Sequence, residues 1–263
     1  MDGAKESKRY IDVVLRTLDV LELFLTHEKL KLKDIYDLTG MQKNRIIRIC
    51  GTLMSRGFLI FSKDEMTYSL GPLVSFLGHR FDRKNSSLAV IQNVLEQLSL
   101  ETGETSHFCV RRGFCRFCLA IADGTKALRF AIEPGSVSPL NASASGKVLL
   151  AFLPEEEYGE ILKDMPFVAV TSHSILDVKI LRKQLDEIRR QGYAASFREN
   201  IPSGAGLAVP VFNKNNQIIG SLNLGGLAED YENGKYVRYL PALREAACQL
   251  STLCGGLQMQ DLI

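Results

Sequence analysis

One helix within residues 32–58 is expected to separate its side chains into an apolar side and a basic side. At 100° per residue, the apolar side holds Ile46, Ile49, Cys50 and Leu53. The opposite side holds Asn44, Arg45, Arg48 and Thr52. The first side is predicted to pack against the protein, which leaves the second side free to contact a polar partner.

The free side lies in a stretch with charges of one sign. From Leu38 to Lys63 the chain contains no Asp or Glu and five Lys or Arg residues, although its formal net charge is only +2. A local positive field on a helix suits the phosphate backbone of nucleic acid. The predicted DNA-contact set is Gln42, Lys43, Asn44, Arg45, Arg48, Thr52 and Lys63. The alternative interpretation is a solvated basic helix face.

The residue types in this set predict different roles. Arg45 and Arg48 could offer forked donors to guanine, and Asn44 could pair with adenine. Lys43 and Thr52 are better placed for phosphate contacts.

A sharp turn must precede this helix if it is to pack on the helix before it. Gly40 permits such a turn, which would bring Ile35 and Leu38 against Ile46 and Cys50. A helix-turn-helix is therefore expected.

Neighbouring elements extend this prediction to a domain. A preceding helix from Ile11 would support the pair through an apolar stripe formed by Val14, Leu18, Leu21 and Leu25. Two β-rich runs, 58–62 and 66–70, follow the helix-turn-helix and predict a wing. The expected organisation is a tail over 1–9, a winged helix-turn-helix over 10–71, linker helices over 72–100 and a second domain over 101–263.

The second domain is expected to be α+β, with an antiparallel sheet flanked by helices. Its β-rich runs are 106–110, 114–121, 127–132, 206–212 and 217–224. Its predicted helices are 147–152, 176–190 and 241–253, and Gly192 is expected to end the second of them.

Composition places the chain among cytoplasmic globular proteins. No apolar run reaches the ~18 residues that span a bilayer, and the N-terminus is polar. The six cysteines are scattered, several in apolar runs, which favours reduced core thiols over a disulfide framework.

Three further patterns could support catalysis, metal binding or nucleotide binding, but none is complete. Cys115 and Cys118 have zinc-like spacing, yet they would point to opposite faces of a strand, and no second pair exists. Ser145 and Lys147 could form a nucleophile and its base, yet two residues apart on a helix they diverge by ~200°. A phosphate-binding loop over 141–147 lacks its first glycine and its magnesium-binding hydroxyl. No metal, cofactor or catalytic residue is therefore predicted.

The order of several motifs resembles the IclR family of bacterial transcription regulators. The first half contributes TGMQKNRIIRICGTLMSRGFL (39–59) and YSLG (68–71). The second half contributes TGETSHFCV (102–110), PLNASASGKVLLAFLP (139–154), Glu199 with Gly204, AVPVF (208–212) and IIGSLNLGG (218–226). The resemblance spans about Val13 to Gly255.

The resemblance implies a winged helix-turn-helix, a linker helix and a GAF-like effector-binding domain. It implies dimers or dimers of dimers on a partly palindromic operator in double-stranded DNA, and a small carboxylate or aromatic acid that alters DNA binding or the recruitment of RNA polymerase. Carried over by position, the effector pocket comprises Leu128, Phe130, Ala144, Ser145, Gly146, Ser196, Gly206, Asn223 and Gly225. Backbone N–H groups at the helix start near Ser145 would suit a carboxylate.

The sequence also departs from the family pattern. Gln42 stands where proline is common and Asn44–Arg45 where Ser-Thr is common, so the operator sequence does not transfer. Ser196 and Gly206 stand where some members carry an acidic residue and a cysteine. The absence of a side chain at Gly206 favours a ligand that is larger than a small keto acid or differently shaped. Tight binding of glyoxylate or pyruvate would count against that hypothesis.

A repressor is the favoured interpretation, with activation left open. An enzyme that carries an auxiliary DNA-binding domain, and a thiol redox sensor using Cys115 and Cys118, are the alternative functions.

Overall fold

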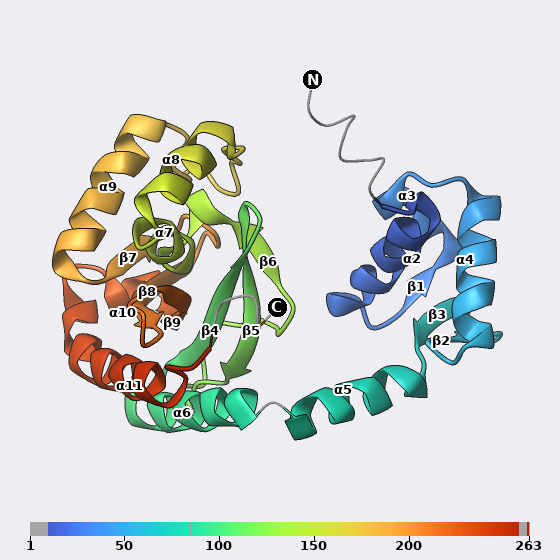
Figure 1. The fold of residues 1–263 in the computed structure, drawn as a ribbon, viewed down its shortest axis with the longest axis horizontal. Coiled ribbons are helices and arrows are strands. Elements are labelled where there is room, and N and C mark those ends of the chain that lie inside the picture. The colour runs from blue at the N-terminus through green and yellow to red at the C-terminus, as the bar shows by residue number, and fades with distance from the viewer. Residues whose placement is uncertain (1–9, 85, 258–261, 263) are drawn as a thin grey trace. The chain divides into compact units, whose positions relative to one another are not determined.

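The computed structural model describes residues 10–84, 86–257 and 262, so the tail predicted over 1–9 lies outside the described residues. The chain divides into two compact units, 1–85 and 86–263, and Figure 1 shows the elements of each. None of the helices among the described residues combines the length and apolar character that crossing a bilayer requires.

The first unit is a helix-turn-helix followed by a wing. Its helices are α2 (Asp12–Glu22), the 3-10 turn η1 (Leu23–Leu25), α3 (Leu32–Thr39), α4 (Lys43–Ser55) and α5 (Pro72–Lys84). Its strands β1 (Leu30–Lys31), β2 (Leu59–Ser62) and β3 (Thr67–Leu70) form an antiparallel sheet in the order β1-β3-β2. The expected winged helix-turn-helix is confirmed, and β1 is an additional strand that the sequence patterns did not predict.

Gly40 ends α3 in the left-handed conformation, with φ at 66°, and its N–H donates to Tyr36 O. Glycine adopts this conformation without the steric cost that a Cβ imposes. The turn brings α4 onto α3, and the predicted inward residues Ile46, Ile49, Cys50 and Leu53 are all buried together with Ile35.

Two details of the predicted packing are wrong. The stripe expected to support the helix pair is largely exposed, at 49% for Val14, 47% for Leu18 and 42% for Leu25. Val20 and Phe24 are buried instead, because a different side of α2 and η1 faces the core. Leu38 is 51% exposed, whereas Ile35 of α3 is buried in the core of the unit and Leu32 packs against that core.

The second unit is built on one antiparallel sheet of six strands, in the order β6-β5-β4-β9-β8-β7 within the described chain. The strands are β4 (Thr105–Arg112), β5 (Cys115–Ala122), β6 (Val137–Pro139), β7 (Ala194–Phe197), β8 (Gly204–Phe212) and β9 (Ile218–Leu227). The helices are α6 (Ser86–Thr102), α7 (Ala144–Ala151), α8 (Glu155–Asp164), α9 (Val178–Gln191), α10 (Ala228–Tyr231) and α11 (Leu240–Leu253), with 3-10 turns η2 (Leu140–Ala142) and η3 (Lys235–Tyr239). The expected α+β class is confirmed.

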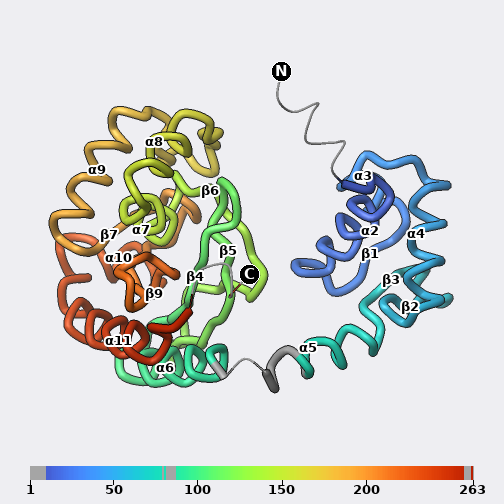
Figure 2. Tube along the Cα trace, in the orientation of Figure 1, coloured from blue at the N-terminus to red at the C-terminus, as the bar shows by residue number. Residues whose placement is uncertain are grey.

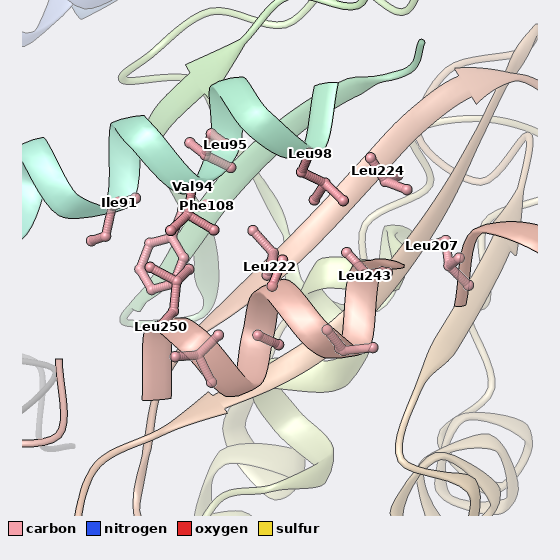
Figure 3. Packing of buried hydrophobic residues seen from close by; sticks show 14 of the residues in the cluster. Ile91, Val94, Leu95, Leu98, Phe108, Leu207, Leu222, Leu224, Leu243 and Leu250 are labelled. Atoms are coloured by element: carbon pink, nitrogen blue, oxygen red, sulfur yellow. The ribbon is translucent and has the colours of Figure 1, made fainter. Parts of the chain in front are cut away.

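Helices cover both faces of this sheet, so the unit has three layers. One face packs against α6 and α11 through an apolar core that includes Leu95, Leu98, Phe108, Leu222 and Leu250 (Figure 3). The other face packs against α7, α8 and α9 through a second core, and the trace in Figure 2 shows these helices grouped together. The two cores bury the strands on both sides, which fixes the positions of the residues between them.

Three sequence predictions in the second unit need correction or addition. The run 127–132 is a loop rather than a strand, and it is β6 that pairs with β5. Thr105 Oγ1 donates to Phe130 O at 2.7 Å, so the loop is held by a side chain rather than by a ladder. Helix α8 and strand β7 were not predicted. Pro154 is the N-cap residue of α8, and the three glutamates in the first turn favour a helix start there, because negative charge stabilises a helix N-terminus.

Gly146 and Gly159 form a matched pair for testing the packing of α7. A Cβ on Gly146 would lie 2.4 Å from Leu140 O, whereas nothing lies within 4 Å of a Cβ on Gly159. Gly146→Ala should lower the free energy of unfolding by about 1–3 kcal/mol, and Gly159→Ala should raise it by roughly 0.5–1 kcal/mol. Calorimetric melting of both variants checks this, and equal effects would contradict the packing described.

Candidate functional sites

The predicted DNA-contact residues lie on α4, at its N-cap, and in the turn of the wing. Gln42, Lys43, Asn44, Arg48, Thr52 and Lys63 are exposed, and Arg45 is half-buried. Helix α4 thus presents Asn44, Arg48 and Thr52 on the side opposite its buried residues, as an element that reads a groove must.

Arg45 is engaged by a neighbouring helix. Its guanidinium donates to the carboxylate of Asp12 on α2, and this hydrogen bond lowers the pKa of Asp12. Because the side chains of Arg45 and Asp12 are 41% and 65% exposed, solvent screens the ion pair, which therefore stabilises the unit only weakly. Arg45 can therefore exchange Asp12 for another acceptor at little cost, whereas Arg48 donates no hydrogen bond to another described side chain.

A second candidate site lies on the face of the large sheet that α7 covers. Four strands of the sheet place polar side chains there: Arg116 on β5, His107 on β4, Asn223 on β9 and Ser196 on β7. Register pairs His107 with Asn223 across β4 and β9. All four side chains are buried, and together with the start of α7 they surround a cavity of about 40 Å³. We call this the inner cavity.

Most of the effector residues expected from the family resemblance lie around this cavity. Its lining includes Phe130, Ala144, Ser145, Ser196, Gly206, Asn223 and Gly225. Leu128 is 74% exposed and lines a separate open cleft of about 800 Å³. Gly146 faces away from the inner cavity and packs on the backbone of Leu140.

Phe130 occupies the space above two glycines of the sheet. A Cβ at Gly225 would lie 2.6 Å from the Phe130 ring, and a Cβ at Gly204 would lie 3.0 Å from it. The ring also stacks on His107 with centroids 6.2 Å apart. Phe130 borders both the inner cavity and the open cleft, as do Arg116, Asn200 and Ile201, so these four residues form the boundary between them.

The start of α7 offers fewer free donors than the sequence suggested. Ala144 N–H donates to Ser196 Oγ at 3.0 Å, and Gly146 N–H donates to Ser143 Oγ at 3.1 Å. Lys147 N–H donates to Ser143 O. Ser145 N–H is the donor of this turn that has no partner in the described chain, so the expected carboxylate seat on the helix start is mostly filled by the protein itself.

Lys147 is buried and paired with Glu199. Its ammonium lies 2.6 Å from Glu199 Oε1 and 3.1 Å from Gln184 Oε1. Burial lowers the pKa of Lys147 and raises that of Glu199, and attraction between the two opposes both shifts. Because Lys147 is engaged with these partners, the geometry does not support it as a general base for Ser145.

Arg116, like His107, is a residue of this site that the sequence interpretation missed. It is only 4% exposed. Its Nε donates to Ser138 Oγ at 2.7 Å, and its Nη1 lies 3.8 Å from Cys109 Sγ. No carboxylate in the described part of the chain forms an ion pair with it. The alternation of side chains along β5 could have indicated that Arg116 is buried, because it places Arg116 on the same side of the strand as Cys118.

The cysteines do not form the pair considered from the sequence. Cys118 is buried opposite Cys109 in the β4–β5 register, whereas Cys115 is on the other side of β5. All six cysteines are free thiols. No group of three or more His, Cys, Asp or Glu among the described residues could hold a metal ion.

A winged helix-turn-helix joined in one chain to a sheet domain with a buried polar cavity defines the class of ligand-responsive DNA-binding regulators. Family models agree. The model for the IclR helix-turn-helix domain matches residues 13–60, and the model described as bacterial transcriptional regulator IclR C-terminal matches residues 84–252. The chain belongs to the IclR family of bacterial transcriptional regulators.

Individual relatives cover nearly the whole chain. The transcriptional regulator KipR of Bacillus subtilis is 28% identical over 92% of this chain and 96% of its own. XynR of Escherichia coli is 28% identical over 93% and 98%. Among solved structures, an IclR regulator from Alicyclobacillus acidocaldarius superposes with a TM-score of 0.82 at 28% identity, covering 92% of this chain and 98% of its own. A homologue from Microbacterium hydrocarbonoxydans, complexed with 4-hydroxybenzoate, shares the fold with a TM-score of 0.74 at 22% identity, covering 91% and 98%.

His107 should make stability depend on pH. Burial, and next the charge of Arg116, lower its pKa to about 3 from an ordinary value of 6.5. Between these two pH values, the unfolded chain therefore binds a proton at His107 that the folded chain does not bind. The contribution of His107 to the free energy of unfolding is complete above pH ~6.5. It is lost as pH falls, by about 2 kcal/mol between pH 6.5 and 5.

Urea denaturation at the two pH values measures this loss. His107→Asn should remove that part of the pH dependence, whereas His173→Asn, at an exposed position, should leave it in place. An unchanged slope in His107→Asn would show that another group titrates.

Proposed function

We propose that this chain binds double-stranded operator DNA through the exposed side of α4 and through Lys63 of the wing. The observation that carries the proposal is the division of α4 into a buried side, with Ile46, Ile49 and Leu53, and an exposed side with Arg48 and Asn44. Arg45, Arg48 and Asn44 read base edges, while Gln42, Lys43, Thr52 and Lys63 position the protein on the backbone.

The second unit acts as the effector-binding domain, with the inner cavity as its ligand site. Its buried polar groups and the ligand held by the Microbacterium hydrocarbonoxydans homologue support this assignment. Ligand in the cavity alters the separation of two recognition helices in a homodimer or dimer of dimers. Half-sites lie one helical turn apart, ~34–36 Å, so a small change in separation costs affinity.

The protein acts in the cytoplasm, chiefly as a repressor, and recruitment of RNA polymerase would make it an activator at other operator positions. Binding of the full chain to its own upstream intergenic DNA, compared with a scrambled duplex at two salt concentrations, tests the regulator function. Equal affinity for both duplexes would reject it.

Single substitutions separate base reading from backbone contact. Arg48→Ala should weaken operator binding by about 1–3 kcal/mol and relax base preference, because a forked donor is lost. Lys43→Ala should instead weaken binding to all sequences and reduce the salt slope by about 1.

Fluorescence anisotropy with operator and scrambled duplexes measures both effects. Lys163→Ala, which removes an exposed charge from α8, is the control and should change neither quantity. If Arg48→Ala and Lys43→Ala weakened binding to every duplex equally, the base-reading role of Arg48 would be wrong.

A further inference from the structure

We propose that Arg116 binds the carboxylate of a small hydroxycarboxylic acid in the inner cavity, and that Asn223 Oδ1 accepts a hydrogen bond from the hydroxyl of that ligand. Both side chains line the cavity and both are buried. The inference rests on the proposed function, since it names the chemical class of the effector.

The charges around the cavity leave one positive charge without a carboxylate counter-ion. In the described chain the side-chain partners of Arg116 are Ser138 and Cys109, and neither is a carboxylate. Burial raises the pKa of the Cys109 thiol, but its hydrogen bond with Cys118 and the charge of Arg116 lower this pKa to about 7, so the thiol offsets the positive charge only in part. Glu199 is neutralised by Lys147, and His107 is uncharged because of its low pKa. A buried guanidinium without a counter-ion is costly, and a bound monoanion would remove that cost.

The hydrogen bonds of the cavity leave acceptors without donors. Asn223 Nδ2 already donates to His107 O and Ser221 O, at 3.0 and 2.8 Å. Its Oδ1 is buried without a partner, as are His107 Nδ1 and Glu199 Oε2. A carboxylate alone cannot satisfy an acceptor, so the ligand must also carry a donor. A hydroxyl group meets this requirement without adding a charge.

The space available limits the ligand to a few atoms. A cavity of about 40 Å³ holds about three water molecules, which matches a two- or three-carbon acid. The absence of a side chain at Gly206 does not enlarge it, because Ser196 Oγ and Ala144 Cβ lie 3.3 and 3.6 Å from the position of a Cβ there. The larger ligand expected from the sequence would require Phe130 to leave its place above Gly225.

Three matched probes test the proposal on the full-length protein by isothermal titration calorimetry. Glycolate carries both groups, acetate lacks the hydroxyl, and glycolamide lacks the charge. Glycolate should bind about ten-fold more tightly than acetate, because only glycolate satisfies the orphan acceptor. It should bind about 100-fold more tightly than glycolamide, because only the anion pairs with Arg116.

Substitution of Arg116 supplies the second arm. Arg116→Met should reduce glycolate affinity to that of glycolamide, and it should not lower the melting temperature of the ligand-free protein, since it removes an uncompensated buried charge. Arg116→Lys keeps the positive charge but loses the paired N–H donors of the guanidinium, so an intermediate affinity for glycolate is expected. Arg190→Met, at an exposed arginine of α9, is the control. If Arg116→Met did not fold, the probe comparison on the unmodified protein would still decide the question.

Three outcomes overturn the proposal. Equal binding of glycolamide and glycolate removes the anion-binding role of Arg116, and equal binding of acetate removes the role of Asn223. No glycolate binding at roughly 10 mM, a very weak affinity, excludes the small hydroxy acid. Operator binding measured without acid is independent of all three, so it shows separately whether the proposed regulator function fails.

Discussion

Both faces of the six-stranded sheet must be buried, and the different ways in which they are covered determine the rest of the second unit. The face under α6 and α11 is apolar throughout, with Leu95, Phe108 and Leu250 in one continuous core. The face under α7 changes from apolar to polar where β4, β5 and β9 run beneath the start of that helix. Polar groups buried there need partners, and the protein supplies only some of them.

This incomplete satisfaction connects structure to function. A site in which every polar group is paired within the protein would be more stable, but it would have no free donor, acceptor or charge to bind a ligand. Lys147 and Glu199 Oε1 pair at 2.6 Å. Asn223 Oδ1, in contrast, has no hydrogen-bond partner in the described chain, and Arg116, which also lines the cavity, has no carboxylate partner there. In the first unit, Arg45 forms an ion pair with Asp12 that is open to solvent. A nucleic acid can replace Asp12 with little loss of stability, because such an ion pair contributes little.

Periodicity predicted the long elements because each buries one regular side. Helix α4 with Ile46 and Leu53, helix α9 with its Gly192 terminator, and the antiparallel sheet followed from local pattern alone. The failures depended on tertiary contacts. The side of α2 that is buried, the loop at Phe130 that Thr105 holds, and the short strand β7 are set by what packs against them.

The same limit applied to the cavity. The family resemblance named residues that lie around it, but local pattern could not show that a buried arginine from β5 lacks a carboxylate partner. That conclusion needs every neighbour of Arg116 in three dimensions.

The most direct test of the link between the two units is to measure the affinity of the full chain for operator DNA at increasing glycolate concentration, and its affinity for glycolate with and without operator. Linkage requires both affinities to change by the same factor. Glycolate binding that is indifferent to operator would contradict the proposed regulation.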